Sequence, residues 1–401
     1  MSKVLRILAV ASIAALSSSA AAQAQEAQQP AAQEEAVDAA ALKGQIESLA
    51  EQVAEMKGDV SGLKRLKFSG YVQARYAWLE SITYNDTPAA GPPQTNFFIR
   101  RARFKAVYDA DWSQYALQLD ATPRGVLVKE AYASLRLPKG LAIDAGLQLM
   151  PFGYEVLVRS SSDLDLLERA LVTRYYLGGE YDLGIALRGA YGPLHFKVGL
   201  FNGNGVDAWA FANASAGLDN DQLKDVIGRV GFDLGVVTGG VSGWYGKTID
   251  YGSAGDAKHD RYRVGADLQA YLDLLPFGGT AVKGEWLWGR TGIANLNNGA
   301  GTGLDVTGHG WYALLTQNVG PWQQLAARWE EFTPDNTAST DAAGSTTVKT
   351  VRQLQLALHS YVGQAFKLSL AWSHPMNGER GDAAPADPEA DQWVAQMQAK
   401  F

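Results

Sequence analysis

The chain contains no cysteine among its 401 residues. This absence excludes disulfide bonds, thiolate catalysis and cysteine-based zinc sites, and it also excludes a lipidated cysteine anchor. Charged residues make up only 19% of the chain, below the usual quarter. After residue 24 there is no run of about 18 apolar residues, so membrane-spanning helices are not expected.

Signals of an enzyme are equally scarce. The five histidines lie on separate segments, and none belongs to a recognisable motif with a serine nucleophile. No glycine-rich loop with its lysine is present to cradle a phosphate group. We therefore expect no enzymatic activity, no cofactor, no metal site and no nucleic-acid partner.

The N-terminal residues predict export. Residues 1–24 have the pattern of a signal peptide: Lys3 and Arg6 form a basic start, Ile7–Leu16 an apolar core, and Ala22–Ala24 a cleavage site of small residues. Residues 25–41 are rich in alanine, glutamine and glutamate, which predicts a flexible spacer.

Residues 42–65 carry a heptad pattern that predicts a coiled-coil helix. Apolar residues recur at alternating spacings of four and three: Leu42, Ile46, Leu49, Val53, Met56, Val60 and Leu63. A single amphipathic helix packed on its own domain is the alternative. These residue types favour a coiled coil of two helices, whereas a three-fold assembly would need a coiled coil of three helices. The number of copies in the oligomer therefore stays open.

The last nine residues alternate in polarity with a period of two. Trp393, Ala395, Met397, Ala399 and Phe401 share one face of a strand, and polar residues occupy the other. The same alternation begins at Leu66. A soluble β-sandwich would show the same alternation. The lengths of the links between segments therefore have to indicate whether the apolar faces contact lipid or a protein core.

About sixteen such segments follow one another from residue 66 to residue 401. They start near residues 66, 96, 112, 126, 141, 182, 194, 226, 238, 261, 280, 309, 322, 351, 365 and 392. Short turns alternate with long links, as in bacterial outer-membrane barrels, where an even strand number returns both chain ends to the periplasm. We therefore predict an all-β transmembrane barrel of about 16 antiparallel strands, with the coiled-coil helix in the periplasm. Aromatic residues near strand ends fit an interfacial girdle: Tyr76, Trp78, Trp286, Trp288, Trp329, Trp372 and Trp393.

The predicted inward face carries about fifteen basic side chains against about seven acidic ones. The candidate pore-lining residues are Arg75, Arg101, Arg103, Lys105, Arg136, Arg188, Arg229, Arg261, Arg263, Lys283 and Arg328. Basic rings in a narrow pore attract anions, although such charges could instead pair with one another. Arg101, Arg103 and Lys105 have no acidic neighbour on their own strand, so we expect them to be unpaired.

The third long link, Pro151–Tyr181, exceeds ordinary connections in length. Folded inward, it would narrow the lumen and set the size and charge of a constriction. Its candidate residues are Pro151, Phe152, Gly153, Glu155, Arg159, Asp163, Asp165, Glu168 and Arg169.

This stretch also carries a resemblance to a known family. Five segments occur in an order that resembles the phosphate-selective porins O and P. They are Gly146–Glu155, Leu167–Ala170, Gly179–Ile185, Phe201–Gly205 and Asp219–Val230. Ile99–Phe104 and Phe68–Tyr71 are similar to that family as well, and the match covers most of residues 66–232. The resemblance implies a sixteen-stranded trimeric barrel with an inward-folded third loop and passive anion uptake. The family's phosphate-specific members add a lysine-rich outer loop, whereas here the fifth outer loop offers only Lys247, Lys258 and His259.

Three functions are compatible with these features. The first is an outer-membrane porin of a Gram-negative bacterium that passes small solutes and prefers anions, phosphate among them. The second is a general or sugar-preferring porin, with Tyr132 and Trp311 contacting sugars in the lumen. The third is an envelope tether or adhesin that uses the coiled coil as a spacer. The expected partners are membrane lipid, other copies of the chain, small anionic solutes, and an assembly machinery that recognises Phe401, as the resemblance implies.

Overall fold

The computed structural model describes residues 44, 47–53, 55–56, 62, 64–79, 82–84, 87–89, 94–123, 125–177, 180–203, 223–250, 257–291, 306–333, 350–377 and 391–401. The predicted signal peptide and spacer lie outside the described residues. Among those described, no helix is both long and apolar enough to cross a bilayer.

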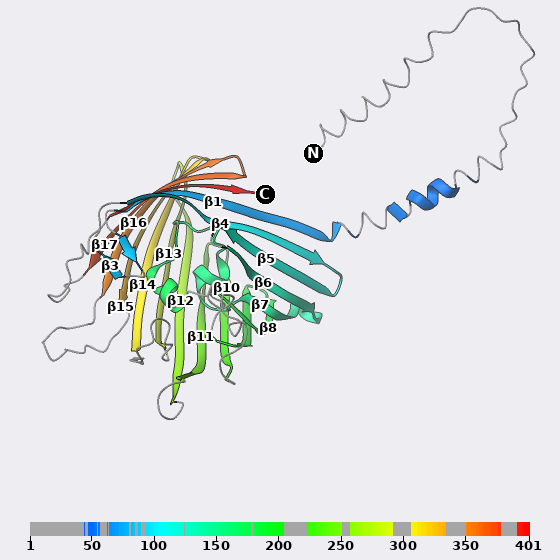
Figure 1. Ribbon diagram of the computed structural model, residues 1–401, viewed down its shortest axis with the longest axis horizontal. Helices are drawn as coiled ribbons and strands as arrows, with labels where there is room; N and C mark the ends of the chain where they lie inside the picture. Colours follow the sequence, from blue (N-terminus) through cyan, green and yellow to red (C-terminus); the bar gives the residue numbers. More distant parts are fainter. Residues whose placement is uncertain are drawn as a thin grey trace, which may run out of the picture. The chain divides into compact units, whose positions relative to one another are not determined.

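Sixteen antiparallel strands form a closed barrel, as predicted (Figure 1). Each strand pairs with the next along the chain, and β1 pairs with β18 to close the cylinder. The strands are β1 (Leu66–Leu79), β4 (Gln94–Asp109), β5 (Ser113–Thr122), β6 (Gly125–Arg136), β7 (Leu141–Leu149), β8 (Tyr181–Tyr191), β9 (Leu194–Phe201), β10 (Asp225–Asp233), β11 (Val237–Asp250), β12 (Ala257–Leu275), β13 (Gly278–Thr291), β14 (Val306–Val319), β15 (Gln323–Thr333), β16 (Val351–Val362), β17 (Phe366–Asn377) and β18 (Gln392–Lys400). A separate two-stranded sheet joins β2 (Ile82–Tyr84) to β3 (Thr87–Ala89) in the first long link.

Short and long links alternate around the barrel, as the sequence indicates. Three residues join β4 to β5, and two join β8 to β9, whereas thirty-one separate β7 from β8. The link between β5 and β6 is short, although it falls at the end of the barrel where the long links lie. One end of the barrel is therefore bounded by tight turns, and the other carries almost all the residues between strands.

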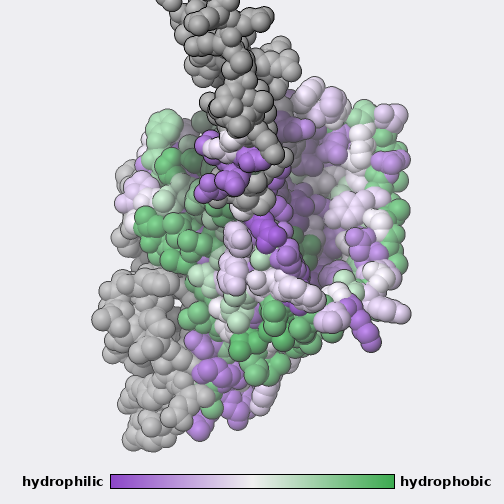
Figure 2. Space-filling model, turned by 90° about the vertical axis from the view of Figure 1, so that its right-hand side faces the viewer, coloured by the Kyte–Doolittle hydropathy of each residue, from purple (hydrophilic) through white to green (hydrophobic). Residues whose placement is uncertain are grey.

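The two faces of the strands differ in polarity. On β1, Val72 and Tyr76 are exposed, whereas the intervening Gln73 and Arg75 are buried in the interior. In Figure 2, hydrophilic residues gather around the hollow at the centre of the view, and hydrophobic residues lie on the flanks. An apolar outer face with a polar inner face is the arrangement of a membrane barrel.

Strand β11 resolves a facing that its many glycines obscure in the sequence. Ser242 and Trp244 point inward, whereas Val241 and Tyr245 are exposed on the outer face. One prediction is wrong: Trp311 lies on the outer face, where it pairs with Trp286, while its neighbour Tyr312 is the buried inward residue. Trp311 is therefore not a lumen residue.

The closing seam joins β1 to β18 and includes the last residue. Phe401 N donates to Gly70 O at 3.0 Å, and Gly70 N donates to Phe401 O at 3.1 Å. A Cβ on Gly70 would meet the Phe401 ring and Arg103 O, so only glycine fits there. At the opposite end of the seam, Trp393 pairs with Trp78 on one side and with Trp372 on the other. Three of the predicted girdle residues are therefore neighbours in the barrel, and their position at a membrane interface stays a prediction.

In the predicted coiled-coil segment, residues 47–53 are helical. Three heptad residues are described there, and all three are exposed: Leu49 at 59%, Val53 at 42% and Met56 at 57%. An exposed apolar stripe fits a helix that associates with other copies, but the coiled coil itself stays a prediction.

Candidate functional site

Residues Met150–Glu180, called the inner loop below, fold into the barrel. The segment contains a π-helical turn, η2 (Gly153–Val158), and a short helix, α3 (Leu171–Tyr176). Its backbone bonds to inward side chains of distant strands: Tyr154 N donates to Glu285 Oε1 at 2.9 Å, and Leu171 N donates to Glu330 Oε2 at 2.8 Å. On the far side, the His359 ring nitrogen Nε2 lies 2.7 Å from Asp165 O. The inner loop therefore crosses the lumen and narrows it.

Apolar packing holds the inner loop against the barrel. Phe152, Val156, Val172 and Tyr176 of the loop are buried in one cluster with strand residues. The strand members include Ile227, Trp244, Leu287, Tyr312 and Phe332, which belong to strands β10, β11, β13, β14 and β15. Burying several large apolar side chains stabilises such a contact by about 1.5–3 kcal/mol each. The loop is thus a packed part of the core.

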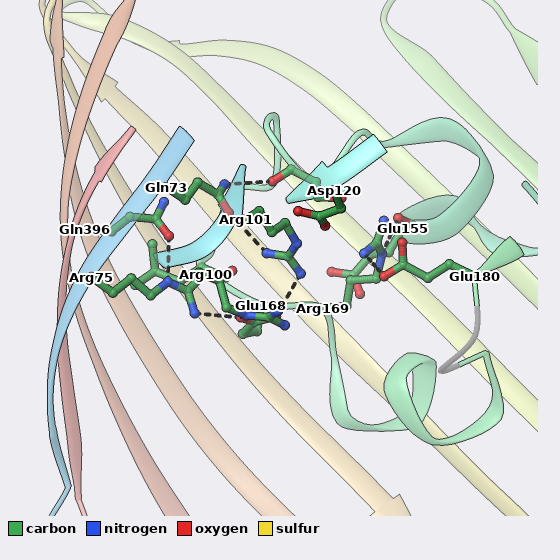
Figure 3. Close-up of polar contacts among 12 residues, drawn as sticks. Gln73, Arg75, Arg100, Arg101, Asp120, Glu155, Glu168, Arg169, Glu180 and Gln396 are labelled. Carbon is green, nitrogen blue, oxygen red and sulfur yellow. Dashed lines mark hydrogen bonds and ion pairs between the residues drawn. The ribbon is translucent and has the colours of Figure 1, made fainter. Parts of the chain in front are cut away.

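Three arginines converge on one carboxylate of the inner loop, Glu168 (Figure 3). Arg75 Nη1 lies 2.6 Å from Glu168 Oε1, Arg100 donates to both carboxylate oxygens at 2.6 and 3.0 Å, and Arg101 Nη2 lies 3.3 Å from Oε2. Burial raises the pKa of Glu168, but the three guanidinium groups outweigh it and hold the pKa well below its ordinary value of 4.5. This arginine cluster has two positive charges in excess.

Arg100 reaches the interior through a β-bulge. Gln73 pairs with Arg101, but the next residue, Ala74, pairs with Ile99, so Arg100 is an extra residue in β4. A bulge re-aims side chains and shifts the alternation beyond it. Alternation counted back from Arg101 would turn Phe98 outward, but the bulge reverses this facing: Phe98 pairs with the inward Arg75, and Phe97 takes the outer position beside Tyr76.

A second bulge lies between β5 and β6. Gln118 pairs with Glu130 and Leu119 with Val128, which leaves Lys129 as the extra residue. Its Nζ lies 5.5 Å from the centre of the buried Tyr181 ring. Strict alternation misses both Arg100 and Lys129. The sequence signal that could have found Arg100 is the pair of adjacent arginines, because one of two neighbouring strand residues would otherwise face lipid.

The prediction that three basic residues of β4 are unpaired is wrong, because Arg101, Arg103 and Lys105 all have carboxylate partners. Arg101 contacts Glu168, Arg103 Nε lies 3.0 Å from Asp120 Oδ2, and Lys105 pairs with Glu130. The partners come from the inner loop and from strands β5 and β6, which the sequence of β4 cannot reveal.

Most other candidate basic residues are also paired. Arg188 lies 3.0 Å from Asp144, Arg261 lies 2.6 Å from Asp225, and Arg229 pairs with Asp267. Two contact the inner loop: Lys283 lies 2.8 Å from Asp165, and Arg328 lies 3.0 Å from Glu155. Arg136 bonds to Asp109 and Ala110 O at the short-turn end, away from the inner loop. Arg263, in contrast, has no carboxylate partner within the part of the chain that the structure describes.

The remaining inner-loop candidates hold the loop in place. Pro151, Phe152 and Gly153 are buried where the loop leaves β7. Asp163 pairs with Lys400, and Arg159 contacts Asp163 O and lies 3.5 Å from Asp165. Arg169 Nε donates to Glu155 O at 2.8 Å, and Arg169 Nη1 donates to Glu180 Oε1 at 2.5 Å. These contacts hold the loop in position. Among the described loop carboxylates, Asp165 contacts two cations, Arg159 and Lys283, whereas Glu168 contacts three.

A cavity of about 380 Å³ lies between the inner loop and the inner face of the first strands. Arg103, Lys105 and Tyr181 line it from the strands, and Ser160 and Ser161 line it from the loop. A second cavity of about 220 Å³ lies between the loop and the last strands. Polar groups thus border open space on both sides of the inner loop.

No protein-family model matches the sequence, and no curated protein matches it. Solved structures do match the fold. An anion-selective porin from Comamonas acidovorans aligns with a TM-score of 0.61 and 13% identity, over 84% of this chain and 99% of that one. The outer membrane channel DcaP of Acinetobacter baumannii has a TM-score of 0.58 and 8% identity, over 84% and 97% of the two chains. The in-vitro folded trimer form of OmpT, an outer membrane protein of Vibrio cholerae, has a TM-score of 0.55 and 12% identity, over 84% and 99%.

The chain therefore has the barrel fold of outer-membrane porins and channels. At these low identities the likeness establishes the fold alone. The resemblance to the phosphate-selective porins O and P stays a prediction.

Proposed function

We propose that this protein is an outer-membrane porin, a water-filled channel for the passive diffusion of small solutes, with a preference for anions. The observation that carries the proposal is the arginine cluster on the inner loop, where three guanidinium groups share the single carboxylate of Glu168. A closed barrel with an apolar outer face supports the membrane setting.

The anion preference follows from charge and position. The cluster lies where the inner loop narrows the lumen, and the low-dielectric protein around it focuses its field into the remaining space. Two excess positive charges there raise the local concentration of anions and oppose the passage of cations. The anion-selective porin among the similar structures is consistent with this proposal.

We also propose an oligomeric state, a cellular location and a first solute for this protein. The exposed heptad residues and the trimer form of one structural neighbour support a homo-oligomer, most simply a trimer. The N-terminal segment would lie in the periplasm of a Gram-negative bacterium, on the same side as Phe401. Phosphate, the solute implied by the family resemblance, is the first anion to test.

Planar-bilayer recording tests the function. Purified protein under a KCl gradient is expected to conduct and to show a reversal potential that favours chloride over potassium. A reversal potential of the opposite sign would contradict the anion preference, and an absence of conductance would contradict the porin. Maltodextrin block without phosphate block would instead favour a sugar-preferring channel, for which Tyr132 is the remaining aromatic lumen candidate.

A further inference from the structure

Arg263 differs from the other candidate basic residues in having no counter-ion among the described residues. It lies on β12, points inward, and is only 8% accessible. Its Nε is buried and without a hydrogen-bond partner. Across the described residues, no carboxylate lies within ion-pair distance of its guanidinium group.

Two aromatic rings flank this guanidinium group. Its central carbon Cζ lies 3.9 Å from the centre of a Trp244 ring and 5.8 Å from the centre of the Tyr176 ring. Both rings are fixed: Trp244 Nε1 donates to Asp225 Oδ2 at 2.5 Å, and Tyr176 Oη donates to Gly289 O at 3.0 Å. Rings can cover the faces of a guanidinium group, but they leave the N–H donors along its edge unsatisfied.

Two carboxylates of this region bond to groups other than Arg263. Asp225 Oδ2 pairs with Arg261 at 2.6 Å and accepts the Trp244 bond, whereas Asp225 Oδ1 is buried without a hydrogen-bond partner and lies beyond ion-pair distance of Arg263. Asp182 accepts hydrogen bonds from the backbone N–H groups of Leu183 and Gly203, at 2.8 and 2.6 Å. Among the described residues, neither carboxylate bonds to Arg263, so both leave its donors unused.

A buried guanidinium group cannot relieve this situation by losing its proton, because arginine stays charged in proteins. A buried charge without a partner is strongly unfavourable unless a counter-ion from solution joins it. The edge of a guanidinium group matches the paired oxygens of phosphate, sulfate or carboxylate groups.

We propose that Arg263 is the residue that recognises oxyanions in this channel, binding phosphate, sulfate or carboxylate groups of a solute through its free N–H edge. This inference rests on the proposed porin function and names its solute class. Arg75, Arg100 and Arg101 already share Glu168, so a solute must compete with a tethered carboxylate for them. Arg263 offers a cation without that competition.

The experiment compares phosphate block of the chloride current in bilayers for the wild type, Arg263→Gln and Arg188→Gln. Both variants remove one inward positive charge, but Arg188 is paired with Asp144, which keeps Lys197 as a partner at 3.5 Å. Arg263→Gln is expected to raise the phosphate concentration for half-block by roughly tenfold, as for loss of a charge-assisted contact. Arg188→Gln is expected to change it by less than about threefold.

Equal effects of the two variants would overturn the assignment, because total lumen charge would then explain the block. Arg263→Lys is a second variant that keeps the charge. It is expected to keep the chloride preference while weakening phosphate block, since an ammonium group cannot form the bidentate hydrogen bonds that a planar guanidinium group forms. Wild-type phosphate block in Arg263→Lys would also overturn the assignment. A wild-type protein that conducts no ions would instead contradict the porin itself.

Discussion

Arg100 donates two hydrogen bonds to the carboxylate of Glu168, at 2.6 and 3.0 Å, although strict alternation along β4 would place it on the lipid-facing side. One extra residue in the strand thus adds a cation at the place where the inner loop narrows the lumen. The pairing of β4 with β1 is regular on both sides of this residue.

Deletion of Arg100 is therefore expected to be tolerated by the barrel and to weaken anion preference. Without the extra residue, Ile99 and Arg101 still pair with Ala74 and Gln73, so both halves of the ladder keep their partners. Arg100→Gln keeps the bulge and serves as the matched variant. Both should lower the chloride-to-potassium permeability ratio to a similar extent in bilayers, by at least roughly twofold. Failure of the deletion variant alone to fold would show that the bulge itself is required.

Glu168→Gln is expected to shift selectivity in the opposite direction. The change leaves the three cluster arginines without their shared carboxylate, so chloride permeability relative to potassium should rise at least roughly twofold. Loss of charge-assisted hydrogen bonds, each contributing about 1.5–3 kcal/mol, should also loosen the loop and increase current noise. Asp111→Asn is the control, because it removes a negative charge whose side chain is 78% exposed, outside the inner loop. An unchanged reversal potential in Glu168→Gln would contradict the role of the cluster.

The inner loop should tolerate mild acid and loosen only in strong acid. The lowered pKa of Glu168 means that its charge stabilises the folded loop, a contribution present above its ordinary value of 4.5 and lost as pH falls through the lowered pKa. Burial raises the pKa of Glu155, although Arg328 opposes the shift. Protonation of Glu155 on acidification therefore favours the folded loop.

Single-channel noise recorded from about pH 8 down to the lowest pH at which the channel stays assembled checks this behaviour. Noise should stay constant or fall through mild acid, and then rise once Glu168 takes up a proton. Glu168→Gln should remove the rise at low pH. A rise in noise already near neutral pH would argue against the assignment to Glu168.

The contact between Gly70 and Phe401 predicts a closure defect. In Gly70→Val, the new side chain would meet the Phe401 ring and Arg103 O, with an expected loss of about 1–3 kcal/mol from overpacking. Phe401→Asp should reduce the yield of assembled protein more than it changes the conductance of channels that do form. Gly243→Ala is the control, since a Cβ there meets nothing within 4 Å. Heat-modifiable migration on gels measures folding, and normal yield in both variants would count against a role of this seam in assembly.

The exposed heptad residues can be tested with a cysteine, because the chain has none of its own. Val53→Cys is expected to form a disulfide between copies, since Val53 occupies a core position of the predicted coiled coil. Adding Leu49→Glu and Met56→Glu should weaken association of the helices by roughly 2 kcal/mol or more and suppress the cross-link. Glu51→Ser lies off the heptad face and should leave cross-linking intact. Absence of any cross-link in Val53→Cys alone would contradict the coiled coil.

The local periodicity of the sequence was sufficient to predict the barrel architecture. Alternation from Leu66 to Phe401 fixed the number of strands, their order and most of their facings, because the side-chain period of a strand is a local property. The alternation of short and long links likewise indicated which end of the barrel would carry the inner loop.

Charge pairing was decided only by the tertiary structure. The partners of Arg101, Arg103 and Lys105 lie on the inner loop and on neighbouring strands, and a strand's own sequence does not specify them. The bulge that turns Arg100 inward depends on the register between two strands. Arg263 differs for the same reason: its lack of a counter-ion among the described residues depends on several strands and on the inner loop, which come together only once the barrel has closed.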